Sequence, residues 1–367
     1  MKKPRLLSIS TLALLTYSCL SIMSTVYSGD LPPGESAPVR DLYSDTWVGV
    51  DDLGRPMPIG GIDCPLPQED RTVVIFYFLW HGQHSKSGPW DITRITAENP
   101  DDPKWGPPGH FHHWGCPELG YYVQPDAYVY RHHAQMLADA GVDALSCDVT
   151  NRITYPKCCD QLLETLETMQ SQGQKVPQVL FLTNSNHDQA VAELYDTIYA
   201  KNRYRDLWFS WNGRPLIMAS PEGHSDEISQ FFTFRRSWAW TRGGRRADWF
   251  GDGRDCWPWL DDYPQSWGWH ERPDIPEQVV VAVAQHPISN IGKSFHDGAE
   301  PAAEDRKPGE GLYFQEQWRR ALEVDPQVVF ITGWNEWVAQ RFVVHEGGHN
   351  QMLGRRLDNG QSYFVDL

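Results

Sequence analysis

The chain has 367 residues, with 48 acidic against 32 basic side chains and a formal net charge of −16. A surface this acidic repels phosphate groups, so nucleic acid and anionic lipid are excluded as expected partners. The length suits a single α/β barrel, a fold that commonly runs to about 250 residues or more as one domain.

The N-terminus carries the pattern of a signal peptide. Three basic residues precede an apolar stretch from Leu6 to Met23, and small residues around Ser28 form a cleavage site. The pattern predicts a leader over residues 1–28 and a secreted or periplasmic protein that starts near Gly29. The alternatives are a membrane anchor and a lipoprotein modified at Cys19. We see no second stretch long enough to span a bilayer, so the mature protein is expected to have no membrane span.

The rest of the chain divides into two parts. Residues 29–70 are rich in Pro, Gly and Asp and predict an extended N-terminal segment, and residues 71–367 predict one barrel domain. Six cysteines follow the leader, and an even count outside the cytoplasm permits disulfides without indicating their pairing. Cys147 lies in an apolar run, so we expect it to be a free thiol in the core.

Apolar runs alternate with helical segments along residues 71–332. The expected strands are 73–78, 142–149, 179–183, 215–219, 237–240, 278–284 and 328–332, and the expected helices are 127–140, 161–172, 189–200, 225–234 and 311–324. This alternation indicates a parallel sheet, and seven strands favour a closed (β/α)8 TIM-type barrel with long top-face loops over a doubly wound sheet. We see neither a Gly-x-Gly-x-x-Gly motif nor a P-loop after the first strand, which disfavours nucleotide binding. Ser362–Val365 is the expected eighth strand. No helix follows it, so we expect either that an irregular segment closes the barrel or that the barrel is incomplete at the C-terminus.

In such barrels the active site lies at the C-terminal ends of the strands. Polar and aromatic residues crowd nearly every one of these predicted ends. The expected substrate-binding residues are Trp80, His81, Asn151, Asn184, His187, Trp240, Gln285, His286, Trp334, Asn335 and Trp337.

Three carboxylates are candidates for catalysis. Hydrolysis of a glycosidic bond needs two groups, one to protonate the leaving oxygen and one to act as base or nucleophile. Glu336 is the first candidate because it follows a buried strand and stands between two tryptophans; the alternative is a helix cap. Asp148 is the second, at the tip of an expected strand, and the alternative is an ion pair with Arg152. Glu222 is the third, and the alternative is an acid at a helix N-terminus.

The chain contains 17 tryptophans, an unusual abundance. Seven of them fall between Trp238 and Trp269, among Gly, Asp and Arg. Flat indole faces suit sugar rings, so the cluster favours carbohydrate binding, although a place in the core is the better explanation for any single tryptophan.

The histidines raise the question of a metal site. His110, His112 and His113 form the densest group, but no matched carboxylate or cysteine lies nearby in the sequence. We therefore expect no metal and no cofactor. A metal-dependent hydrolase remains the alternative.

The segment Val328–Trp337, Val-Val-Phe-Ile-Thr-Gly-Trp-Asn-Glu-Trp, resembles the glycoside hydrolase family 71/99-like group, which is related to endo-α-mannosidases. Asp206–Met218 and Ile75–Trp80 are similar to two further segments of that group. The resemblance implies a (β/α)8 barrel, a hydrolase and a catalytic role for Glu336. It also implies a second Glu three residues later, where this chain has Ala339.

This departure leaves two hypotheses. The first is a secreted glycoside hydrolase acting on an extracellular polysaccharide or glycan, with Asp148 or Glu222 as the second group. The second is a catalytically inactive carbohydrate-binding barrel. The mannosidase specificity does not carry over on either hypothesis.

Overall fold

A computed structural model describes residues 50, 54–56, 63, 68, 70–82, 88–113, 115–239, 250–283, 296–299, 301–305, 307–345 and 360–365. The expected signal peptide and most of the expected N-terminal segment lie outside these ranges. Three expected substrate-binding residues, Trp240, Gln285 and His286, lie outside them as well.

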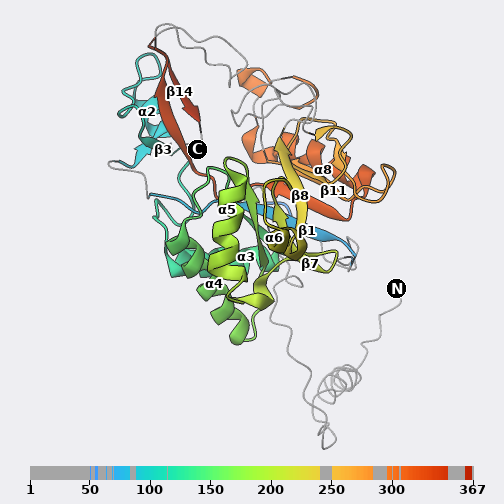
Figure 1. The fold of residues 1–367 in the computed structure, drawn as a ribbon. Helices are drawn as coiled ribbons and strands as arrows, with labels where there is room; N and C mark the ends of the chain where they lie inside the picture. The colour runs from blue at the N-terminus through green and yellow to red at the C-terminus, as the bar shows by residue number, and fades with distance from the viewer. Residues whose placement is uncertain are drawn as a thin grey trace, which may run out of the picture. The chain divides into compact units, whose positions relative to one another are not determined.

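The core of the structure is a nearly closed barrel of parallel strands, which confirms the expected fold (Figure 1). Eight parallel strands follow one another in hydrogen-bonded order within the described ranges, and the first and last lie at the seam of the barrel. In that order they are β11 (Gln278–Ala282), β12 (Val328–Thr332), β1 (Thr72–Tyr77), β4 (Ala144–Val149), β5 (Gln178–Thr183), β7 (Arg214–Met218), β8 (Thr233–Ala239) and β9 (Cys256–Leu260).

Side chains bridge the seam between β9 and β11. Gln278 Nε2 donates a hydrogen bond of 2.7 Å to the carbonyl of Pro258 in β9. The hydroxyl of Thr332, at the end of β12, donates to the carbonyl of Trp259. These bonds occupy main-chain acceptors of β9 that would otherwise be buried without a partner, which is costly.

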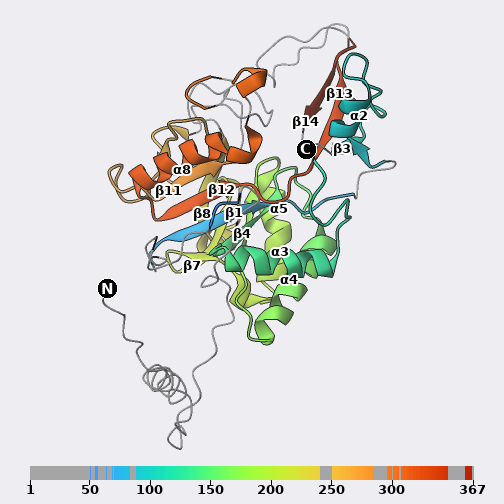
Figure 2. The same ribbon diagram turned by 180° about the vertical axis from the view of Figure 1, so that it is seen from behind.

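Helices connect most of these strands and cover their outer face. They are α3 (Ala127–Asp139), α4 (Pro156–Ser171), α5 (His187–Leu194), which continues as a π-helix over Tyr195–Tyr199, α6 (Asp226–Phe231) and α8 (Leu312–Val324). Asp126 caps α3 by accepting from the amides of Tyr128 and Val129, and the helix buries Tyr130, Ala134 and Leu137 at helical spacing. Figures 1 and 2 show α8 beside β11, away from α3, α4 and α5. In the described part of the chain, no helix is long and apolar enough to cross a bilayer.

A second, four-stranded sheet gathers segments from two distant loops. Its order is β14 (Ser362–Val365), β13 (Val338–Val343), β3 (Phe111–His113) and β2 (Trp90–Asp91), and α2 (Ile92–Glu98) follows β2. Smaller elements are β6 (Ser210–Trp211), β10 (Trp267–Gly268) and the 3₁₀ turns Arg205–Leu207, Ala303–Asp305 and Pro308–Glu310.

The structure corrects two of the expected elements and adds one strand that the sequence analysis did not predict. Ser362–Val365 is β14, which pairs antiparallel with β13 and not with the barrel, because β12 already lies against β1. The strand that completes the eight is β9, whose sequence Cys-Trp-Pro-Trp-Leu contains no β-branched residue, unlike β1, β11 and β12. The helix expected to reach residue 234 ends at Phe231, and the following strand begins at Thr233.

The cysteine expectation is met at Cys147, which is a fully buried free thiol in β4. Burial raises the pKa of this thiol well above its usual range, so it is inert toward oxidation at neutral pH.

The carboxylate of Glu277, directly before β11, joins four elements at the N-terminal ends of the strands. It accepts two bonds of 2.6 Å from Arg235 of β8, through Nε and Nη2. The indole N–H groups of Trp211 and Trp257 donate to it at 2.7 and 2.8 Å. Burial disfavours the charged form, yet the hydrogen bonds and charge of Arg235 outweigh it and hold the pKa of Glu277 below its usual value.

We predict that Glu277→Gln destabilises the fold by about 3–5 kcal/mol, because it removes the carboxylate 2.6 Å from the buried Arg235 and leaves only the more distant Asp255, at 3.5 Å. Urea unfolding followed by tryptophan fluorescence measures the change. The matched control is Glu271→Gln, at an exposed position six residues earlier. Equal unfolding midpoints for the two variants would contradict the role given to Glu277.

Candidate active site

Glu336 lies just past the C-terminal end of β12, on a segment that crosses the end of β1. Gly333 begins this crossing. A Cβ atom at Gly333 would lie 2.9 Å from Cδ1 of Phe76, so only glycine fits without displacing the Phe76 ring. The amide of Trp334 then donates to the carbonyl of Phe76 at 3.1 Å. The close approach therefore fixes where the Trp-Asn-Glu-Trp segment starts.

The side chain of Asn335 holds this segment in place. It is fully buried, and its amide makes two bonds to the main chain of Phe78: Oδ1 accepts from N at 2.7 Å and Nδ2 donates to O at 3.0 Å. The ring of His81 bonds through Nε2 to the carbonyl of Asn335. Asn335 and His81, both expected to bind substrate, instead position the backbone next to Glu336.

Asp148 is the last residue but one of β4, the strand on the other side of β1. Ser146, two residues earlier, donates to Met218 Sδ of β7 at 3.6 Å, although β5 separates the two strands. Ser146 therefore faces the barrel interior, and the two-residue period of a strand places Asp148 on the same face. Asp148 is 2% exposed and accepts from the amide of Thr150 at 2.9 Å. Since neighbouring strands lie about 4.8 Å apart, β4 and β12 are about 10 Å apart across β1.

Three further expected residues surround this region. Asn151 follows β4, and its side-chain Nδ2 is buried with no hydrogen-bond partner among the described residues. Trp334 and Trp337 are half-buried on either side of Asn335 and Glu336. The Trp334 ring meets His133 edge-on at 5.8 Å. A buried donor without a partner is costly unless a ligand or water satisfies it, so Asn151 is suited to a substrate hydroxyl.

Trp80 does not offer a surface to a sugar. Its side chain is 1% exposed and is enclosed by Phe78, at a ring distance of 4.1 Å, and Phe111, at 4.7 Å. The residue is part of the core, which is the commoner place for a single tryptophan.

The remaining candidates, Asn184, His187 and Glu222, form a separate group at the ends of β5 and β7. A cavity of about 220 Å³ lies here, and its lining residues are Thr183, Asn184, His187, Ser220, Arg236 and Ser237. Sequence reasoning missed Arg236 and Ser237. The pair Arg235-Arg236 could have indicated this, because successive residues of a strand face opposite sides. Two adjacent arginines in a strand therefore have different partners, and here Arg235 binds Glu277 and Arg236 binds Glu222.

Glu222 is exposed and already paired. Its side chain is 65% exposed and lies 2.7 Å from Nη2 of Arg236, and Ser220 donates a hydrogen bond to it. The Ser220 bond, with the Arg236 charge, holds the pKa of Glu222 below its usual value. A carboxylate that stays ionised is poorly suited to donate a proton, so these surroundings do not favour Glu222 as the general acid.

Two buried histidines, His81 and His133, lie next to the segment that carries Glu336: His81 bonds to Asn335 and His133 meets the Trp334 ring. The hydroxyl of Tyr77 lies 2.9 Å from Nδ1 of His133. Burial lowers the pKa of His81 to about 3 and that of His133 to about 4. Among the described residues, no three His, Cys, Asp or Glu side chains are grouped so as to hold a metal ion.

Comparison with solved structures finds similar folds. Two structures of the GH99 endo-α-mannosidase from Bacteroides thetaiotaomicron, one of them in complex with Bis-Tris propane, match with 16% sequence identity. The matches cover 74% of this chain and 86% and 85% of the mannosidase chains, with TM-scores of 0.44 and 0.43. Both belong to the group that the Trp334–Trp337 segment resembles. No family model matches the chain, and no curated protein does.

We predict that the fold loses stability as the pH falls from about 6.5 toward 4. The folded state holds His81 and His133 neutral, whereas the unfolded chain takes up their protons below about pH 6.5. Each of these histidines then weakens folding by up to about 1.4 kcal/mol per pH unit. Urea unfolding between pH 7.5 and 4 measures the slope.

The variant His133→Gln should flatten this slope, and His345→Gln, at an exposed position, should leave it unchanged. An identical pH dependence in the parent and in His133→Gln would show that His133 is not responsible.

Proposed function

We propose that the protein is a glycoside hydrolase in which Glu336 is the general acid and Asp148 the second carboxylate. The observation that carries the proposal is the placement of Glu336. Its segment is anchored to β1 by the close approach of Gly333 and the two bonds of Asn335, at the end of the barrel where active sites lie. An acid that must meet a glycosidic oxygen needs such a rigid support.

Asp148 is the partner that the strand order supports. It lies near the end of the strand on one side of β1, and Glu336 follows the strand on the other side. This strand order supports an arrangement in which the two carboxylates act on one bond. Two carboxyl groups on either side of the scissile bond are what glycoside hydrolysis requires. The unpartnered amide of Asn151 and the half-buried rings of Trp334 and Trp337 supply a hydroxyl partner and stacking surfaces.

Ala339 stands where the glycoside hydrolase family 71/99-like group has its second Glu. This replacement supports either a sugar linkage different from the group's or a different residue as the second catalytic group. Ala339 lies in β13, where it pairs with His112 of β3. A methyl group cannot activate a neighbouring hydroxyl, so the proposal does not extend to mannosidic bonds. The same residue favours the second candidate function, a carbohydrate-binding barrel without turnover.

We predict that Glu336→Gln lowers kcat at least about a thousandfold, which corresponds to roughly 4 kcal/mol of transition-state stabilisation. Asp148→Asn should have an effect of similar size, because each carboxylate works on the same bond. Reducing-end release from a panel of polysaccharides and glycans measures turnover, and Glu271→Gln is the control. Activity of the parent should also fall on the alkaline side, where the acid loses its proton.

Two results would overturn this assignment. Turnover that survives Glu336→Gln would place the chemistry elsewhere. Binding of a glycan without turnover in the parent, unchanged by the mutation, would identify the inactive binding barrel.

We also propose that the chain is exported, on the basis of the basic and apolar residues before Ser28. N-terminal sequencing of protein recovered from outside the cytoplasm should start at or near Gly29. An intact Met1 on that protein would contradict cleavage.

A further inference from the structure

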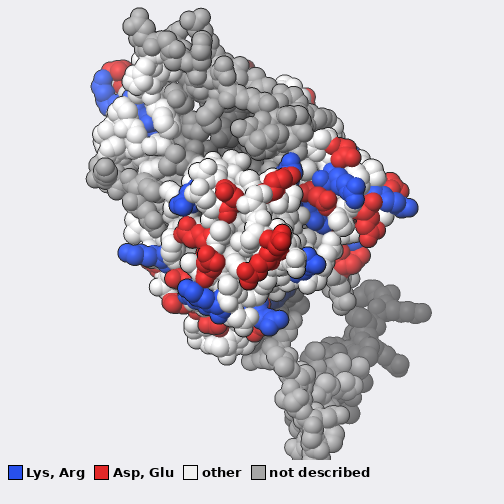
Figure 3. All heavy atoms as spheres, viewed as in Figure 1, with Lys and Arg blue, Asp and Glu red and all other residues white. Residues whose placement is uncertain are grey.

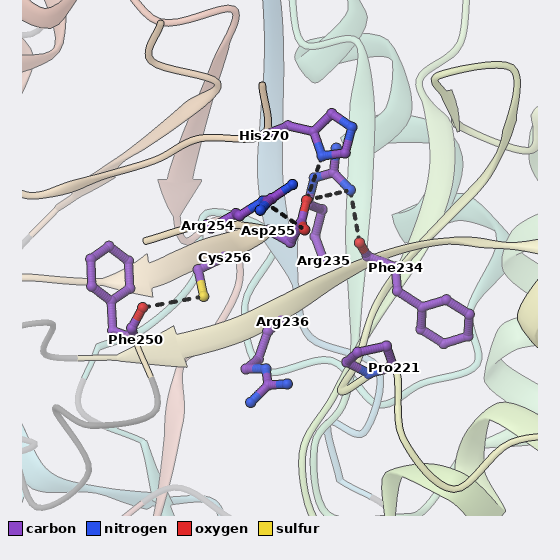
Figure 4. A pocket seen from close by; sticks show the side chains of 9 residues that line it. All are labelled: Pro221, Phe234, Arg235, Arg236, Phe250, Arg254, Asp255, Cys256 and His270. Atoms are coloured by element: carbon purple, nitrogen blue, oxygen red, sulfur yellow. Dashed lines mark hydrogen bonds and ion pairs between the residues drawn. The ribbon is translucent and has the colours of Figure 1, made fainter. Parts of the chain in front are cut away.

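A second cavity, of about 380 Å³, lies where the first half of β8 meets the residues that lead into β9 (Figure 4). Its lining contains three arginines, Arg235, Arg236 and Arg254, together with His270 and Asp255. None of these residues belongs to the group around Glu336, so the cavity is a feature that the proposed hydrolase does not use.

Two of the charged residues are already committed to the fold. Arg235 is 3% exposed and bound to Glu277. Asp255 is shared by three partners: Nδ1 of His270 at 2.5 Å, Nη1 of Arg235 at 3.5 Å and Nε of Arg254 at 4.0 Å. Glu277 already pairs closely with Arg235, so Asp255 serves mainly His270 and Arg254, and its contact with Arg254 is long, at 4.0 Å.

Arg236 and Arg254 remain accessible to a ligand. Their side chains are 32% and 62% exposed. The guanidinium of Arg254 lies over the Trp269 ring at 5.6 Å, which holds it in place without neutralising it. Arg236 is paired with Glu222, but that carboxylate is 65% exposed, and exposed ion pairs contribute about 1 kcal/mol or less. An incoming anion can therefore replace Glu222 at low cost.

The acidic surface of the rest of the molecule sets this cavity apart as a place where an anion can bind. The chain carries a net charge of −16, and acidic side chains spread over the face that bears α5 and α6 (Figure 3). An anion is repelled by such a surface and is held only where arginine side chains are accessible and weakly paired. A cavity with two accessible arginines is thus a local exception.

The remaining lining suits a sugar better than a bare anion. Phe234 adds an apolar face to the cavity, and Arg236 also lines the neighbouring cavity of about 220 Å³. There Asn184, Ser220 and Ser237 offer amide and hydroxyl groups. Apolar faces with a few convergent polar groups are typical of small-molecule sites.

We propose that the larger cavity binds an anionic saccharide, with its carboxylate or sulfate held by Arg236 and Arg254 and its ring against Phe234. This site is independent of the hydrolase chemistry and brings a second point of attachment to an acidic glycan.

The test uses two probes with the same sugar backbone, a de-esterified galacturonic acid trisaccharide with charged carboxylates and its full methyl ester without them. Calorimetry on the complete chain at 50 mM NaCl should show binding of the acid at least tenfold tighter than that of the ester. Arg254→Gln and Arg236→Gln should each weaken binding of the acid at least tenfold. Glu222→Gln should tighten it, because it removes the competing carboxylate. The control is Arg272→Gln, an exposed arginine 3.3 Å from Asp274 and outside the cavity.

Equal binding of acid and ester would overturn the proposal, as would unchanged binding in Arg254→Gln, whose exposed position poses no threat to folding. A sulfated disaccharide as an alternative probe separates the two anion chemistries, and binding of either one supports the site. Inorganic sulfate that binds as tightly as the trisaccharide would overturn the saccharide assignment. Circular dichroism confirms that each variant is folded.

Discussion

The barrel depends on the hydrogen bonds that the buried carboxylate of Glu277 accepts from Arg235, Trp211 and Trp257. A parallel barrel is stable only when its last strand meets its first, and here side chains of Gln278 in β11 and Thr332 in β12 donate to main-chain carbonyls of β9. Glu277 stands at this seam and binds groups from β6, β8 and β9 together. Four hydrogen bonds offset the cost of burying its charge, and their donors come from segments far apart in the sequence, so the arrangement forms only in the closed barrel.

The opposite end of the barrel depends on β1. This strand has β12 on one side and β4 on the other, and the Gly333–Asn335 segment contacts the main chain of both Phe76 and Phe78. The registers of these strands therefore determine where Glu336 and Asp148 lie relative to each other. The Glu277 hydrogen bonds lie at the N-terminal ends of the strands and the proposed chemistry at the C-terminal ends, a division typical of this fold.

Sequence reasoning found the elements whose signal is local. Runs such as Val328–Thr332 and Gln278–Ala282 are rich in β-branched residues and predict buried strands directly. It missed β9 because Trp and Pro do not follow that pattern, and it assigned β14 to the barrel because pairing depends on partners far along the chain. The same limit applies to the site. The place of Glu336 after a buried strand can be read from the sequence. The hydrogen bonds between Asn335 and Phe78 and the ion pair between Glu222 and Arg236 join residues far apart in the chain, so the sequence does not predict them.

The tryptophans show that an unusual composition can serve the core as well as a candidate binding site. Indole combines a large apolar surface with one N–H donor, so it can fill a core and satisfy a buried acceptor at the same time. Trp257, from the cluster that favours sugar binding, is fully buried and donates to Glu277, and Trp269 donates to the carbonyl of Asp252 at 2.7 Å. Much of the abundance therefore serves the fold. Within the described chain, the rings suited to stacking on a sugar are those of Trp334 and Trp337, because they are half-buried beside the carboxylate at which the reaction is proposed to occur.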